Sequence, residues 1–161
     1  MRYPTVFAAI VAVGMMTTTA KAQEFDLTFN NVAISVSDLD ESIAFYRDIL
    51  GFEVVSQTYF EPVSAKVAFI ALADVRLELL EVEGSERLPE LDTPPPTHLL
   101  TQGFKAIVFD VNDLSGFTQY LNANEVETLW EELVLDDAGS TSTLFRDPDG
   151  NLINVFGVSD D

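Results

Sequence analysis

The sequence runs Val32-Ala-Ile-Ser-Val-Ser-Asp-Leu39 and, 75 positions later, Ile107-Val-Phe-Asp-Val-Asn-Asp-Leu114. Both segments contain the pattern Val-x-Asp-Leu at the same place. In both, a short apolar run that is typical of a strand leads into polar residues that favour the start of a helix. Because a repeated strand and helix start indicates a repeated unit, we expect the chain to fold from two similar modules.

Each module is predicted to contain one strand, one helix and then three more strands. The first helix is expected over residues 39–50, with Ser37 as its N-cap. The second is expected to end near Leu121, with Asn112 or Asp113 as its N-cap. The later strands are expected at residues 53–58, 66–72, 76–82, 127–132, 142–146 and 152–156.

A βαβββ unit leaves one face of its sheet uncovered, so two such units are expected to pair. The predicted fold class is α+β, with two βαβββ modules that form a curved, partly closed mixed sheet around a concave pocket. Within a single domain at residues 23–161, module one is expected at about 28–83, a linker at about 84–102 and module two at about 103–158. The linker contains the only histidine of the chain, His98.

The first 22 residues have the pattern of an export signal. Arg2 supplies a charged start, residues 6–16 are apolar apart from one glycine, and Ala20-Lys21-Ala22 matches a cleavage site. We expect cleavage near Ala22 and a mature chain that is periplasmic or secreted. The apolar run is shorter than the roughly 20 residues that a membrane-spanning helix needs, so no membrane insertion of the mature chain is expected.

The composition is strongly acidic and excludes several classes of function. The chain has 8 basic and 27 acidic side chains, for a formal net charge of -19. Cleavage after Ala22 removes Arg2 and Lys21 but no acid, so six bases face 27 acids and the charge becomes -21. Such a surface repels phosphate backbones, which excludes nucleic acid as a partner. The absence of cysteine and the single histidine exclude thiolate and multi-histidine metal centres.

Two stretches carry a family resemblance: Asn31-Val-Ala-Ile-Ser-Val-Ser-Asp-Leu-Asp-Glu-Ser-Ile-Ala-Phe-Tyr-Arg-Asp-Ile-Leu-Gly-Phe52 and Phe145-Arg-Asp-Pro-Asp-Gly-Asn-Leu-Ile153. They resemble the vicinal oxygen chelate superfamily, which includes glyoxalase I, bleomycin-resistance proteins, extradiol dioxygenases and methylmalonyl-CoA epimerase. The resemblance covers about residues 25–158 and implies the two-module fold and a small-molecule ligand or substrate. Because the superfamily closes its pockets within one chain or between two, it leaves monomer and homodimer both open.

The resemblance also implies four pocket positions, which bind a divalent cation in the metal-dependent members. It places Asn31 and Ala106 where the first strand of each module carries histidine, and Glu78 and Asn154 where a later strand carries glutamate or a similar group. Only Glu78 is a strong ligand, because amides bind hard cations beside carboxylates or waters and Ala106 offers no donor. We therefore expect these four residues to line a ligand pocket that holds no metal cofactor.

Three functions are compatible with this pocket. The first is a lyase-type or isomerase-type reaction on a small oxygenated molecule without a metal, with Glu78 as the candidate acid/base. The first alternative is non-catalytic binding or sequestering of such a molecule. The second alternative is a metal-dependent lactoylglutathione-lyase-type activity with an atypical ligand set. Glu78 has a purely structural interpretation as well, as a buried carboxylate paired with Arg76 or with an amide.

Two other polar features are open to a functional and to a structural interpretation. His98 would act as a proton shuttle if the linker folded over the pocket, but a single histidine after a proline run is more typical of an exposed loop. The sequence Asp147-Pro-Asp-Gly150 is similar to an acidic metal loop, yet it is stronger as a hairpin turn. We therefore expect an exposed His98 and a turn at residues 147–150.

The acidic excess generates a prediction about salt. Like charges at this density repel one another in the folded state, and dissolved salt screens that repulsion. We expect the melting temperature of the protein to rise between low salt and molar salt, as measured by calorimetry in sodium chloride. A melting temperature that stays constant or falls would contradict an adaptation to salty surroundings.

Overall fold

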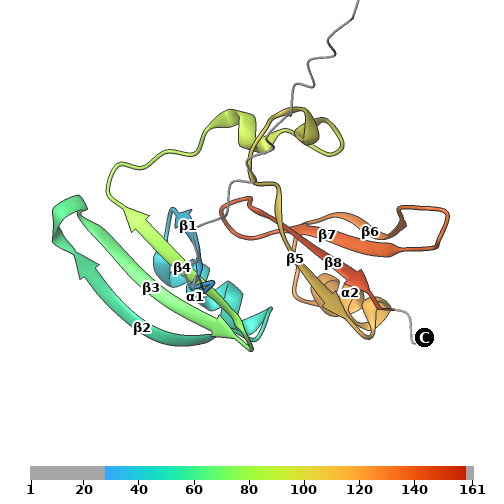
Figure 1. Cartoon of the computed structure of the whole chain (residues 1–161), viewed down its shortest axis with the longest axis horizontal. Coiled ribbons are helices and arrows are strands. Elements are labelled where there is room, and N and C mark those ends of the chain that lie inside the picture. The colour runs from blue at the N-terminus through green and yellow to red at the C-terminus, as the bar shows by residue number, and fades with distance from the viewer. Residues whose placement is uncertain (1–27, 159–161) are drawn as a thin grey trace, which may run out of the picture.

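The fold consists of two modules with the same order of elements (Figure 1). The computed structural model describes residues 28–158, so the expected export signal at residues 1–22 lies outside the described residues. Module one contains β1 (Val32–Val36), α1 (Leu39–Asp48), β2 (Glu53–Phe60), β3 (Ala65–Leu72) and β4 (Val75–Val82). Module two contains β5 (Ala106–Val111), α2 (Leu114–Ala123), β6 (Thr128–Val134), β7 (Thr141–Arg146) and β8 (Leu152–Gly157). The predicted α+β fold class is confirmed.

Each module forms its own four-stranded mixed sheet. The strand orders are β1-β4-β3-β2 and β5-β8-β7-β6, and the first strand of each module pairs in parallel with the last. β1 and β5 therefore stand at the edges of two separate sheets. The structure corrects the expectation of one partly closed sheet: the two sheets do not join, because a pocket and the linker occupy the space between these two edges.

Acidic N-caps fix where both helices begin. The Asp38 carboxylate accepts a hydrogen bond from the Glu41 N–H at 2.9 Å, so Asp38 is the N-cap and the prediction of Ser37 is wrong by one residue. Ser37 instead donates its backbone N–H to Asp149 at 2.7 Å. In α2 the cap is Asp113, which accepts from Gly116 at 2.9 Å. None of the helices within residues 28–158 is long and apolar enough to cross a membrane.

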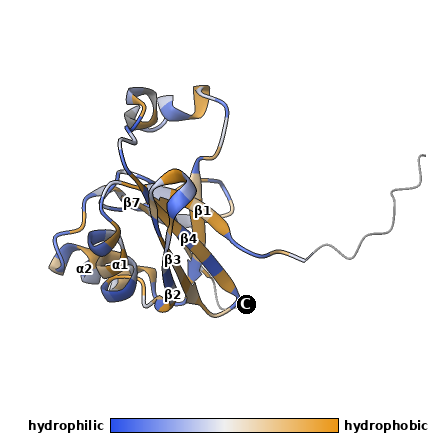
Figure 2. Ribbon diagram, turned by 90° about the vertical axis from the view of Figure 1, so that its left-hand side faces the viewer, coloured by the Kyte–Doolittle hydropathy of each residue, from blue (hydrophilic) through white to orange (hydrophobic). Residues whose placement is uncertain are grey.

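The helices cover one face of each sheet, and their buried sides merge into one core. Figure 2 shows α1 and α2 on the same side of the strands. Leu77 and Leu79 point from β4 into this core and are fully buried. The rings of Phe52 and Phe109 meet across the two modules with centroids 6.3 Å apart. The two modules therefore share an apolar core, while no α-helix of residues 28–158 covers the opposite face of either sheet.

A buried carboxylate joins the two modules at one point. Asp147 accepts backbone N–H bonds from Asp149 and Asn151 at 3.0 and 2.7 Å, and the Asn151 amide at 2.9 Å. It also accepts the hydroxyl of Tyr46, on α1 of module one, at 3.0 Å. These bonds confirm the turn at residues 147–150. They also explain why an acid can begin it, because a buried carboxylate needs hydrogen-bond donors for its oxygen atoms and the turn supplies them.

The same turn reaches module one a second time through Asp149. Its carboxylate accepts the backbone N–H of Ser37 at 2.7 Å and the hydroxyl of Ser42 at 3.2 Å. Both donors lie at or near the start of α1, where a helix favours negative charge. The turn therefore bonds to the start of the helix of the other module, and the two modules are held in a defined orientation.

This junction generates a prediction about pH. Burial raises the pKa of Asp147 against the opposing effect of its hydrogen bonds. The stability that this group contributes is therefore complete below the unfolded-state pKa, about 4, and is lost as the pH rises through the raised pKa. We expect Asp147→Asn to cost about 1–3 kcal/mol in the free energy of unfolding, because it weakens the junction. That cost should be larger at low pH than at neutral pH.

Urea unfolding of both proteins across this pH range checks the expectation. The matched control is Asp137→Asn, which removes the same charge from an exposed residue. A cost of Asp147→Asn that grows with pH would mean that the hydrogen bonds outweigh burial.

Candidate functional site

A pocket of about 560 Å³ lies where the two modules meet, between β1 and the start of β5. Its wall consists of residues 32–37, residues 85–88, Leu91, His98, residues 101–107 and residues 149–152. The linker thus forms one side of the pocket and the turn after β7 another. The volume falls within the range of pockets that bind small molecules.

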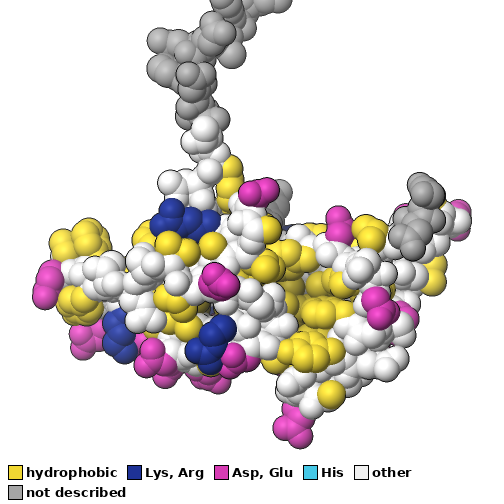
Figure 3. Space-filling model, turned by 90° about the horizontal axis from the view of Figure 1, so that it is seen from below, with side chains coloured by type: hydrophobic (Ala, Val, Ile, Leu, Met, Phe, Trp, Pro, Cys, Tyr) yellow, Lys and Arg dark blue, Asp and Glu magenta, His cyan; other side chains and the backbone are white. Residues whose placement is uncertain are grey.

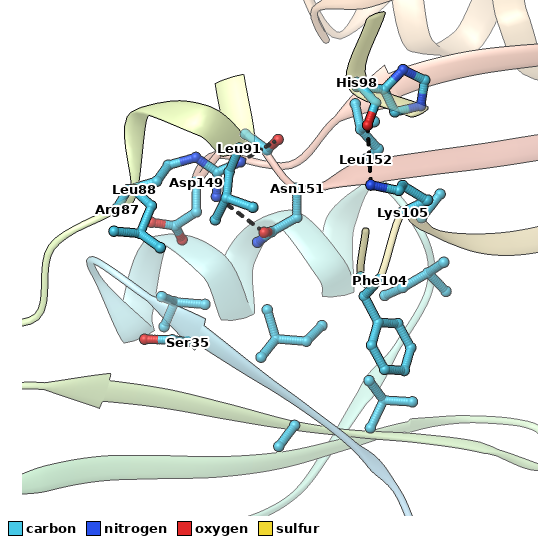
Figure 4. A pocket seen from close by; sticks show the side chains of 18 of the residues that line it. Ser35, Arg87, Leu88, Leu91, His98, Phe104, Lys105, Asp149, Asn151 and Leu152 are labelled. Carbon is cyan, nitrogen blue, oxygen red and sulfur yellow. Dashed lines mark hydrogen bonds between the residues drawn. The ribbon is translucent and has the colours of Figure 1, made fainter. Parts of the chain in front are cut away.

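Hydrogen bonds tie the linker to module two around this pocket (Figure 4). The Arg87 guanidinium donates to the Asn151 side chain at 3.2 Å and to the Gly150 carbonyl at 2.9 Å. The Lys105 ammonium donates to the backbone carbonyls of His98, at 3.0 Å, and Thr101. The linker is therefore held over the pocket by two cationic side chains.

The charge around the pocket differs from that of the rest of the surface. Figure 3 shows acidic side chains spread over both halves of one face, with hydrophobic side chains between them. The pocket wall instead brings together Arg87 and Lys105 with two acids, Glu86 and Asp149. Asp149 is already bonded to module one. The pocket is therefore close to neutral in an otherwise strongly acidic protein.

His98 lines this pocket and is half-buried, so the expectation of an exposed loop residue is wrong. Burial, followed by the positive charges of Lys105 and Arg146, lowers its pKa. The imidazole is therefore neutral at neutral pH. Its Nδ1 atom is buried and has no hydrogen-bond partner among the described residues. The sequence did not reveal this placement, because the proline run before His98 is typical of an exposed loop.

Two of the four predicted pocket residues meet in module one. The Asn31 amide donates a hydrogen bond to Oε2 of Glu78 at 2.9 Å. Glu78 lies on β4 directly beside Ala33 of β1, and Ala33 lines the pocket. The pairing of Glu78 with an amide is therefore observed. Glu78 sits one strand away from the pocket wall, and neither member of the pair is among the residues that line the pocket.

The other two residues belong to module two. Ala106 begins β5 and lines the pocket. Asn154 lies on β8 opposite Val108, and its Oδ1 atom is buried without a hydrogen-bond partner among the described residues. No hydrogen bond among the described residues joins either of them to Asn31 or Glu78.

Comparisons with known proteins agree with this architecture. The sequence profile of the Glyoxalase/Bleomycin resistance protein/Dioxygenase superfamily matches residues 28–155. This chain belongs to that superfamily. A solved structure of a glyoxalase family protein from Enterococcus faecalis is 24% identical and has a TM-score of 0.67, covering 83% of this chain and 99% of that one. The likeness shows that the two proteins share a fold.

Two curated relatives of this superfamily member differ in the reactions that their names describe. Metallothiol transferase FosB of Staphylococcus saprophyticus subsp. saprophyticus is 31% identical over 124 residues, which cover 77% of this chain and 72% of FosB. Mitochondrial methylmalonyl-CoA epimerase of Mus musculus is 28% identical over 107 residues, which cover 64% of this chain. The alignment spans only 56% of the epimerase. The relatives therefore establish the superfamily and leave the reaction open.

The residues at the four predicted positions do not fit a divalent metal. Ala106 offers no donor atom, and the Asn31 amide is already bonded to the one carboxylate, Glu78. Asn154 adds a single amide oxygen from the other sheet. Within residues 28–158, no three histidine, aspartate or glutamate side chains are grouped so that they could hold one ion. We therefore derive no step through a metal from these residues.

Sequence reasoning missed three cationic residues of this region. Arg87 and Lys105 fall in the linker and at the entry to β5, and their only signal was their rarity in an acidic chain. For Arg76 the sequence suggests only a pairing with Glu78. In the structure its guanidinium lies instead over the ring of Phe69, at 4.3 Å from the centroid. The position of a side chain across two strands depends on register, which the sequence does not state.

Proposed function

We propose that this superfamily member is an exported domain that binds a small oxygenated molecule between its modules and transfers a proton on it through Glu78, without a bound metal. One observation carries the proposal. A pocket of small-molecule size lies one strand away from a carboxylate whose geometry is fixed by an amide. The export part rests on the pattern of residues 1–22 alone.

The local geometry of Glu78 supports a role in proton transfer. It lies between Leu77 and Leu79, which are buried in the core, so its side chain points to the face without a helix. The Asn31 amide holds Oε2, and Oε1 has no hydrogen-bond partner among the described residues. A carboxylate held in this way can take a proton from a ligand with Oε1 and return it, which is the chemistry of a general base.

The names of the relatives are compatible with this chemistry. Epimerisation inverts one carbon centre, and removal of a proton from one face of that carbon followed by protonation of the opposite face achieves the inversion, so Glu78 would carry one of these two transfers. One relative is named an epimerase and one a metallothiol transferase. Of these two, proton transfer suits this chain better, because its described residues include a positioned carboxylate and no donor set that suits a metal.

The absence of a resident metal is a separate prediction. One carboxylate and two amides from two sheets are a weak donor set for a divalent cation. We expect elemental analysis of protein purified from its native source to find far less than one divalent ion per chain. We also expect a chelator to leave its activity and melting temperature unchanged. One tightly bound ion per chain would favour the metal-dependent lyase alternative.

Replacement of Glu78 tests the proton-transfer role. The substrate would first be identified by mass spectrometry of small molecules that co-purify with the native protein. We expect Glu78→Gln to reduce turnover by about 10²–10⁴-fold, because glutamine keeps the shape but cannot accept a proton. Glu53→Gln, at an exposed residue that begins β2, is the matched control and should leave turnover unchanged.

Two outcomes would contradict parts of this proposed function. Unchanged turnover in Glu78→Gln would remove Glu78 from the chemistry. Recovery of the ligand chemically intact after long incubation with the wild-type protein would instead identify a sequestering protein, because such a protein binds in the same pocket without conversion.

A further inference from the structure

Arg76 and Phe69 form a pair on the same sheet face as Glu78. Arg76 precedes Glu78 by two residues on β4, so both side chains point away from the helix-covered core. Phe69 lies directly opposite Glu78 on β3. The Arg76 guanidinium carbon is 4.3 Å from the centre of the Phe69 ring, which is the geometry of a cation–π contact. The ring therefore contacts the guanidinium on the sheet face that also carries Glu78.

Arg76 has no polar partner within residues 28–158. Other bases of the chain form ion pairs: Arg47 with Asp48, Lys66 with Glu81 and Arg146 with Glu127. Arg76 forms none, although Glu78 is its neighbour on the same face. Its Nε atom is buried and makes no hydrogen bond to any described residue. A buried donor without an acceptor is costly, so this arrangement needs an acceptor from outside the described chain.

We propose that Arg76, stacked on Phe69, is a binding subsite for the carboxylate group of the ligand. This inference rests on the proposed function, because it assumes that the ligand reaches Glu78. A guanidinium presents paired N–H donors in one plane, and a carboxylate accepts two of them side by side. The negative charge of Glu78 beside the subsite disfavours a dianion such as phosphate and favours a singly charged group.

The residues beside this pair in the strand register are small. Small residues flank the Glu78 and Phe69 row on both sides, with Ala33 beside Glu78 on β1 and Ser56 beside Phe69 on β2. A ligand with its carboxylate on Arg76 would therefore place its neighbouring carbon and oxygen toward Glu78. The ligand class is a small oxygenated carboxylic acid whose α-carbon lies near the proposed base.

Nitrogen NMR of the arginine Nε–H groups tests this subsite with two defined probes. Glycolate carries a carboxylate and a hydroxyl, and glycolamide is its neutral counterpart. We expect glycolate to shift the Arg76 Nε–H signal in a saturable way and glycolamide to leave it in place, with total ionic strength held constant. No saturable shift by glycolate, or equal shifts by both probes, would overturn the proposal.

Variants separate recognition from general charge effects. We expect Arg76→Gln to weaken glycolate binding about tenfold to a hundredfold, because a charged hydrogen-bonded pair is lost. Arg47→Gln removes the same charge from the exposed surface of α1 and should leave the affinity unchanged. Arg76→Lys keeps the charge but not the planar fork, so it should bind glycolate more weakly than wild type. Equal affinity in Arg76→Gln and wild type would overturn the proposal.

A second pair of variants keeps the test decisive if Arg76→Gln does not fold. Phe69→Leu removes the ring that orients Arg76 and should weaken glycolate binding while the charge remains. Glu78→Gln should preserve or strengthen glycolate binding, since it removes a neighbouring negative charge. Loss of catalysis in Glu78→Gln with no response of Arg76 to glycolate would uphold the proposed function and reject the subsite. The reverse result would uphold the subsite and reject the proton-transfer role.

Discussion

The buried carboxylate of Asp147 is the contact on which the arrangement of the two modules depends. It organises the turn after β7 by accepting two backbone N–H groups, and it binds module one through the hydroxyl of Tyr46. The next acid in the turn, Asp149, accepts hydrogen bonds from Ser37 and Ser42 at the start of α1. Because the same turn forms a wall of the pocket, the junction that orients the modules also shapes the site.

The pocket exists because two sheets meet without joining. β1 and β5 are edge strands, and edge strands need a cover for their free backbone groups. The linker supplies part of that cover and is fastened by Arg87 and Lys105. Residues from both modules and from the segment between them therefore line one cavity, so its shape responds to the packing of the whole domain.

Acidic and basic side chains are distributed differently in this protein. Acidic side chains dominate the surface, whereas several of the few bases lie at the pocket or on the open face of β4. Arg87 and Lys105 bond backbone or amide oxygens around the pocket, and Arg76 lies on an aromatic ring. In an acidic chain, positions of this kind keep cationic groups close to the site.

The sequence by itself determined the two-module α+β fold, because strand and helix patterns depend on local residue order. A family resemblance placed Glu78 and Asn31 at candidate pocket positions, which stays a prediction, whereas the turn at Asp147 that the sequence predicted is present. Only the tertiary structure decided that the sheets stay separate, that His98 lines the pocket and that the Arg76 guanidinium lies over the Phe69 ring. These features depend on strand register and on how the linker folds back, and both are set by contacts between residues far apart in the chain.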